Sequence, residues 1–273
     1  MSHTYYEATF QIDDGIAEFK MNRPDVLNAL TEGLRIDFKA MLDEVQGNDD
    51  VRALILRGEG RAFSAGGDVK GMGERMNQKV DLTKTRDSLI GLHDWLERLY
   101  NLDCPVIAAV DGLAFGGGFS LALVSDFVLA TPRSKFSAVF GRIGLVPDMG
   151  VVYTLPRVVG LPKAKDIMYT ARTVDADEAL ALGIVHSLHE PDALLPAARD
   201  FAARLARGSK NAIAATKRMT NRSSEATYRQ IAEWEADAQS MMFSTEFNNE
   251  AVRRFLAKED PLYNWDTMDK DAG

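Results

Sequence analysis

The spacing of hydrophobic positions changes along the chain between the alternation typical of a strand and the recurrence every three or four residues typical of a helix. Residues 8–20 alternate around Asp13-Asp14-Gly15, which predicts a β-hairpin because these turn residues tolerate positive φ. Apolar residues then recur every three or four positions over residues 31–46, which predicts a helix that stops at Gly47. Residues 51–57 read as a buried strand and residues 84–101 as a second helix.

An apolar strand that leads into a glycine turn occurs twice along the chain. The apolar strand at residues 106–110 leads into Gly116-Gly117-Gly118, an apparent helix at about 117–124 and a strand at 127–130. The strand at 51–57 likewise leads into a glycine turn, Ser64-Ala65-Gly66-Gly67-Asp68. This repetition predicts an α/β fold of stacked β-β-α units with parallel strands. From about residue 191 the pattern is helical only, so we divide the chain into an α/β core, 1–190, and a helical C-terminal region, 191–273.

Glycine turns of this kind have a chemical use. Because glycine has no Cβ, a backbone N–H at a helix start can face a ligand oxygen directly. Two such turns are the minimum parts of a two-donor oxyanion hole. For either turn alone, tight packing of strand against helix is the competing interpretation.

Composition narrows the function classes. With 273 residues and 46% hydrophobic content, the chain can bury a substantial core, and its net charge of −8 argues against nucleic acid as a partner. The single cysteine, Cys104, excludes an intrachain disulfide, and His186 and His189 have no third ligand in view, so no metal site is expected. Residues 1–7 resemble no targeting segment and no apolar run is long enough to span a bilayer, so we expect a cytoplasmic protein.

Four blocks in order resemble the crotonase (enoyl-CoA hydratase/isomerase) superfamily over nearly the whole chain. They are Asn22-Arg23-Pro24 with Asn28-Ala29-Leu30, Phe63-Ser64-Ala65-Gly66-Gly67-Asp68-Val69, residues 105–118, and Gly144-Leu145-Val146-Pro147-Asp148-Met149-Gly150 with Leu155-Pro156-Arg157. The resemblance implies the crotonase (ClpP-like) fold and an acyl-CoA thioester as substrate. It implies no separate cofactor, since coenzyme A is part of the substrate. It also implies a homotrimer, or a dimer of trimers, packed through the helical C-terminal region.

The resemblance also implies roles for individual residues. It assigns the oxyanion N–H donors to Gly67 and Gly117. The residues that correspond to family contacts with coenzyme A or the acyl chain are Val26, Ala65, Val69 and Phe115, although core packing is an alternative for each. Asp68 is interpreted as a helix cap beside the substrate and Ser120 as a local cap or a substrate contact.

The chain departs from the family's hydratases at both catalytic glutamates, where it has Ser120 and Phe140. Activation of water and delivery of a proton need carboxyl groups that neither residue supplies. Asp148 lies where isomerase branches of the family have their catalytic acid, and its segment looks most like the ring-epoxide phenylacetyl-CoA isomerases and the 3,2-enoyl-CoA isomerases. A turn role after Pro147 is the alternative for this aspartate.

These observations favour an acyl-CoA isomerase with a single aspartate base, Asp148. An apolar pocket lined by Val146, Phe140 and Met149 would raise the pKa of this base and help it to reprotonate the product. An enoyl-CoA hydratase-like enzyme with relocated groups, or a thioester hydrolase with the same oxyanion hole, remains open. So does a non-catalytic acyl-CoA-binding protein.

Overall fold

The computed structural model describes residues 2–68, 71, 73 and 81–266, so Val69, a predicted substrate contact, lies outside the described residues. The larger sheet has the strand order β1-β2-β3-β4-β6-β8-β11. Its strands are β1 (Ser2–Thr4), β2 (Ala8–Asp13), β3 (Ile16–Met21), β4 (Ala53–Gly58), β6 (Val106–Val110), β8 (Phe127–Ala130) and β11 (Ser187–Leu188). From β3 to β11 all neighbours are parallel, while β1, β2 and β3 form an antiparallel meander.

A second, smaller sheet runs in the order β10-β9-β7-β5 and carries the predicted glycine turns. It consists of β5 (Ala62–Ser64), β7 (Leu113–Phe115), β9 (Lys135–Ser137) and β10 (Val174–Asp175). Each of the pairs β4–β5, β6–β7 and β8–β9 places its first strand in the large sheet and its second in the small one. This arrangement confirms the predicted stack of β-β-α units.

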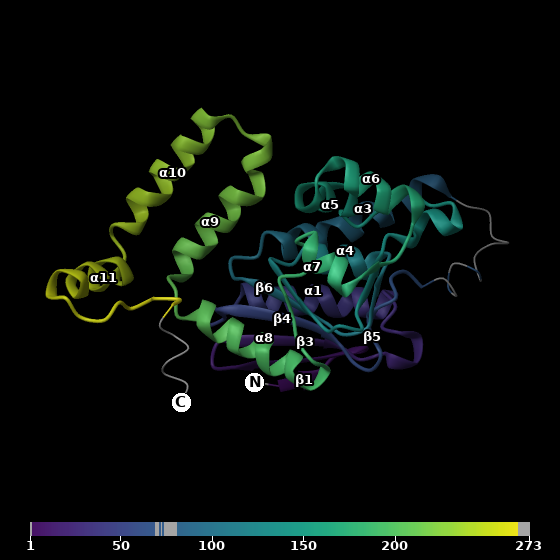
Figure 1. The fold of residues 1–273 in the computed structure, drawn as a ribbon, viewed down its shortest axis with the longest axis horizontal. Helices are drawn as coiled ribbons and strands as arrows, with labels where there is room; N and C mark the ends of the chain where they lie inside the picture. Colours follow the sequence, from purple (N-terminus) through teal and green to yellow (C-terminus); the bar gives the residue numbers. More distant parts are fainter. Residues whose placement is uncertain (1, 69–70, 72, 74–80, 267–273) are drawn as a thin grey trace.

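Helices cover both faces of the large sheet (Figure 1). The larger core lies under α1 (Glu32–Gln46) and α3 (Leu82–Tyr100), and the smaller core lies under α8 (Pro191–Ala206). Successive residues of β4 face opposite ways, so Leu54 and Leu56 join the larger core whereas Ala53 and Ile55 join the smaller one. Burial on both faces explains why these parallel strands are apolar runs rather than alternating ones.

Local predictions from the N-terminal half are confirmed. Asp13 pairs with Ile16, so Asp14 and Gly15 form a two-residue turn with φ of 44° and 74°. The predicted helix is α1, whose N-cap Thr31 accepts a hydrogen bond from the Leu34 N–H at 3.2 Å.

The remaining helices whose bounds the structure describes are spread along the chain. They are η1 (Pro24–Val26), α4 (Gly117–Leu123), η2 (Val139–Ile143), α5 (Val151–Val159), α6 (Leu161–Thr170), α7 (Ala176–Ala181), α9 (Lys210–Arg222), η3 (Ser223–Glu225), α10 (Tyr228–Met242) and α11 (Glu246–Ala257). Helices α9, α10 and α11 extend away from the sheets (Figure 1). Because α8 packs on the large sheet, the first helix of the predicted C-terminal region shares the core, and the division at residue 190 stays a prediction.

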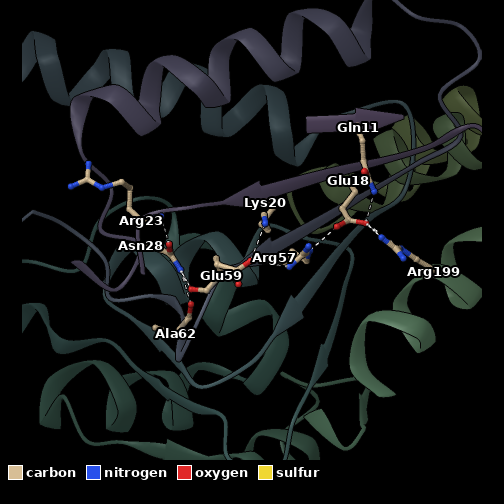
Figure 2. A network of polar contacts seen from close by, with 9 residues as sticks. All are labelled: Gln11, Glu18, Lys20, Arg23, Asn28, Arg57, Glu59, Ala62 and Arg199. Atoms are coloured by element: carbon tan, nitrogen blue, oxygen red, sulfur yellow. Dashed lines mark hydrogen bonds and ion pairs between the residues drawn. The ribbon is translucent and has the colours of Figure 1, made fainter. Parts of the chain in front are cut away.

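A buried carboxylate ties α8 to the sheet. Glu18 of β3 is 4% exposed and accepts hydrogen bonds from Arg57 Nε of β4 and Arg199 Nη2 of α8, both at 2.6 Å (Figure 2). Burial favours the neutral acid, yet the bonds from Arg199 and Arg57 hold the pKa of Glu18 below its ordinary value. The contact fixes α8 across two neighbouring strands.

No helix in the described part of the chain is both long enough and apolar enough to cross a bilayer. The cytoplasmic location stays a prediction.

Candidate active site

The two glycine turns, about fifty residues apart in sequence, lie in direct contact. A Cβ on Gly66 would lie 2.5 Å from the Phe115 carbonyl oxygen and 2.9 Å from the Gly117 nitrogen. Gly66 also has φ of +88°, a conformation that residues with a side chain rarely adopt. The backbone of one turn therefore rests on the backbone of the other only because Gly66 has no side chain.

The two predicted donors lie on either side of this contact. Gly117 is the first residue of α4, where an N–H has no acceptor within the helix, and Gly67 follows Gly66 at an exposed position. Among the hydrogen bonds of the described residues, none is donated by the Gly67 or the Gly117 N–H. Neither N–H is therefore committed to an acceptor within the described part of the chain.

Asn28 and Ser64 hold the Gly67 turn in place. Asn28 is fully buried, and its Nδ2 donates to the carbonyls of Glu59 and Ala62 at 3.0 and 2.8 Å (Figure 2). The Ser64 hydroxyl donates to the Asn28 carbonyl at 2.8 Å and accepts from the Gly66 N–H at 3.2 Å. These bonds fix the main chain just before Gly67, which is a requirement for a preorganised donor.

Asp148 lies in the loop between η2 and α5, and this loop packs on the start of α4. Its neighbour Met149 is buried, with its sulfur so close to Gly117 that a Cβ there would lie 2.6 Å from it. Burial raises the pKa of Asp148, and the electrostatic influence of His93 in α3 and Arg35 in α1 opposes that shift. The structure therefore brings the main chain of the predicted base next to the Gly117 turn.

Ser120 is fully buried on the same face of α4. Its hydroxyl lies 3.0 Å from the Asp148 carbonyl oxygen and 3.3 Å from the Gly116 carbonyl oxygen. The hydroxyl therefore donates to backbone carbonyls. It is not the predicted cap, because the N-cap of α4 is Gly116 and α4 has no side-chain cap bond.

Phe140 also borders the glycine turns. Its side chain is buried, and a Cβ on Gly116 would lie 3.9 Å from Phe140 Cζ. An apolar ring thus occupies a position where the resemblance implies a carboxylate in hydratases. The expectation for Val146 was wrong, because its side chain is 80% exposed and does not shield Asp148 from water.

The other predicted substrate contacts surround the glycine turns. Val26 is 37% exposed in η1, next to Leu27, whose carbonyl accepts from the Ala65 N–H at 2.9 Å. Phe115 is half-buried, and its carbonyl faces Gly66. Asp68 accepts from the Gly71 N–H at 3.0 Å, which is the bonding of a helix N-cap.

A cavity of about 340 Å³ lies beside the Asp148 loop. Gly150 lines it two residues after Asp148, and most of the other lining residues belong to α3, α5, the end of α9 and η3. Its wall includes His93, Leu96, Tyr100, Val124, Tyr153 and Asn221. The end of α9 is held there by a bond from Tyr153 Oη to the Asn221 carbonyl at 3.1 Å. The cavity gives room for an organic group beside the loop that carries Asp148.

The sequence did not identify the residues that support these groups. Asn28 belongs to the first of the four blocks, but the sequence assigned it no role. Nothing in the sequence indicated that Met149 contacts Gly117. Both contacts join positions far apart in sequence, and neither residue belongs to a local pattern. Among the described residues there is no group of three or more metal-binding side chains.

Comparison with known proteins places this site in a family. The family model for enoyl-CoA hydratase/isomerase matches residues 11–266. A crotonyl-CoA hydratase of Syntrophomonas wolfei is 32% identical over 93% of this chain and 96% of its own, and a 1,2-epoxyphenylacetyl-CoA isomerase of Escherichia coli is 30% identical over 92% and 96%. A crystal structure of an enoyl-CoA hydratase/isomerase from Cupriavidus metallidurans superposes with a TM-score of 0.90 at 34% identity, over 96% of this chain and 97% of the other. The chain belongs to the enoyl-CoA hydratase/isomerase family.

Proposed function

We propose that this protein is an acyl-CoA isomerase that moves a proton along the acyl part of its substrate. The observation that carries the proposal is the placement of Asp148: its loop packs on the Gly117 turn, while positions 120 and 140 hold a serine and a phenylalanine. Asp68, the carboxylate next to Gly67, is bonded to the Gly71 N–H as a helix cap. One carboxylate suffices for an isomerisation, since it removes a proton at one carbon and returns it at another. Hydration needs a base for water and an acid for the adjacent carbon, and neither position 120 nor position 140 supplies a carboxyl group for these roles.

In the proposed reaction the thioester carbonyl oxygen lies between the Gly67 and Gly117 N–H groups. Asp148 takes a proton from the carbon next to the carbonyl, and the electron pair of the broken C–H bond moves onto that oxygen. The two N–H groups, held by Asn28, Ser64 and the start of α4, stabilise the developing charge without reorganising. In a 3-enoyl thioester, the protonated Asp148 then gives the proton to carbon 4, which bonds it with the electron pair of the original C3=C4 double bond. The pair on the oxygen re-forms the carbonyl, and the C1=C2 pair of the enolate becomes the new C2=C3 double bond.

The raised pKa of Asp148 supports both half-reactions. A carboxylate with an ordinary pKa of about 3.9 is a weak base, and its acid gives up its proton to water readily. Burial raises this pKa, so the ionised form is a stronger base and the neutral form persists long enough to deliver its proton. We place the acyl group in the cavity that Gly150 lines, since Gly150 follows Asp148 by two residues in the same loop.

A screen of products tests the proposal. The purified protein is incubated with a 3-enoyl-CoA, a 2-enoyl-CoA and an aromatic ring-epoxide CoA thioester, and each product is identified by mass spectrometry. We expect an isomer of unchanged mass from at least one thioester. Addition of water as the main reaction would support the hydratase alternative, free coenzyme A would support the hydrolase, and binding without turnover would support a non-catalytic role.

We also propose that the protein assembles as a trimer, or a dimer of trimers, through its C-terminal helices. Helices α10 and α11 bury no residue, and large apolar side chains are exposed on or beside them. They are Tyr228, Met241, Phe243, Val252, Phe255 and Leu256. Such surface is characteristic of an interface. Sedimentation of the intact chain should give the mass of a trimer or hexamer, and a monomer at micromolar concentration would contradict the proposal.

A further inference from the structure

Ser120 contacts the loop that carries the proposed base. It is 0% exposed, and its hydroxyl has one proton to share between two backbone carbonyls. The shorter of the two contacts, 3.0 Å, is to the carbonyl of Asp148, and the other, 3.3 Å, is to Gly116 in the preceding turn. The residue is therefore joined to Asp148 through the main chain and not through the carboxylate.

The loop has a second anchor on the same helix. Met149 packs on Gly117, and Gly117 and Ser120 are three residues apart, so they lie on one face of α4. The two contacts hold the adjacent loop residues Asp148 and Met149. Met149 and Gly150 both have a left-handed backbone conformation, with φ of 53° and 81°. A backbone of this shape needs outside contacts to stay in one conformation.

We propose that Ser120 is a positioning residue for Asp148, with its hydroxyl holding the carboxylate-bearing loop over the Gly117 turn. This inference rests on the proposed function, in which Asp148 is the base. It assigns Ser120 a role that is neither substrate binding nor proton transfer.

The same geometry explains why position 120 carries no carboxylate. The side chain at position 120 points into a fully buried space closed by the Asp148 loop. A glutamate there, as in the hydratases that the chain resembles, would have to displace the loop. A site of this shape therefore has either a serine at position 120 together with a base at position 148, or a glutamate at position 120.

The test compares Ser120→Ala with Ser125→Ala, using the full chain and a thioester that the wild type isomerises. Ser125 lies just after α4, and its hydroxyl bonds back to the Leu121 carbonyl at 3.3 Å, as Ser120 does to Gly116, without contact to Asp148. We expect Ser120→Ala to lower kcat by about tenfold, since a misplaced base slows the chemical step, and to leave KM within about twofold. Ser125→Ala should match the wild type in both.

A pH profile separates positioning from general destabilisation. Asp148 is faced by His93 of α3 and Arg35 of α1, and both remain in the two variants. A loosened loop admits water to the carboxylate, so the acid limb of kcat should move to lower pH in Ser120→Ala alone. Ser120→Cys, which fills the space but donates weakly, should fall between wild type and alanine, and it replaces the alanine variant if that variant does not fold.

Unchanged kcat and acid limb in Ser120→Ala would overturn the inference, as would a rise in KM alone. Retained turnover in Asp148→Asn would instead contradict the proposed function. The two failures are therefore distinguishable.

Discussion

Replacement of Asp148 by asparagine is expected to lower isomerase turnover by a factor of about 10² to 10⁴, the usual contribution of a positioned acid–base group. Asparagine has nearly the same shape, so the Ser120 contact to the main-chain carbonyl and the packing of Met149 on Gly117 should persist. The measurement is kcat with the thioester selected in the product screen. Asp94→Asn, an exposed change on α3, is the matched control and should leave kcat unchanged.

The pH dependence of the wild type belongs to the same prediction. The base works when ionised, so activity is present above the pKa of Asp148 and is lost as the pH falls through it. Because burial raises that pKa, the acid limb of kcat/KM should lie above the value of about 3.9 for a solvated aspartate. The residual activity of Asp148→Asn should lack this limb. An Asp148→Asn variant with wild-type kcat would remove Asp148 from the mechanism.

The second large effect is expected from Gly66→Ala. The new Cβ would lie 2.5 Å from the Phe115 carbonyl oxygen, and the residue would have to keep φ of +88°, so one glycine turn must move away from the other. The two N–H donors would then no longer converge, and loss of one donor typically costs a factor of about 10² to 10³ in kcat.

Gly91→Ala is the matched control for this change. Gly91 lies in α3, and a Cβ there would meet nothing within 4 Å. It should keep full activity and, as a glycine removed from a helix, lose no stability. Both proteins are assayed below their melting temperatures, so that unfolding does not lower the measured rate. If Gly66→Ala turned over substrate as fast as Gly91→Ala, the oxyanion role of these turns would be excluded.

The sequence predicted the features that depend on neighbouring residues. The hairpin at Asp14-Gly15, helix α1 and strand β6 each follow from a local period and its stop signals, and all three occur where expected. The two glycine turns were also found locally, because each follows an apolar strand. Their contact needed the resemblance, since no spacing rule brings Gly66 to Gly117.

What was not predicted depends on distant contacts. The strands of the small sheet have two or three residues each, too few for a period to be visible, and they pair only because the β-β-α units stack. The support of Gly67 by Asn28 and Ser64 joins positions 36 residues apart, and that of Asp148 by Ser120 joins positions 28 apart. Hydrogen bonds of this kind cannot be predicted from a single sequence, because serine and asparagine are also common in turns and helix caps that make no long-range bond.

The central claim is that one carboxylate moves a proton on an acyl-CoA without adding water. The most direct test is to incubate the wild type and Asp148→Asn with a 3-enoyl-CoA in D₂O and to follow mass and double-bond position together. The account predicts that the wild type yields the 2-enoyl isomer with no water added and at most the deuterium exchanged at Asp148, and that Asp148→Asn yields almost none. A product that has gained a molecule of D₂O, or isomerisation that persists in Asp148→Asn, would contradict it.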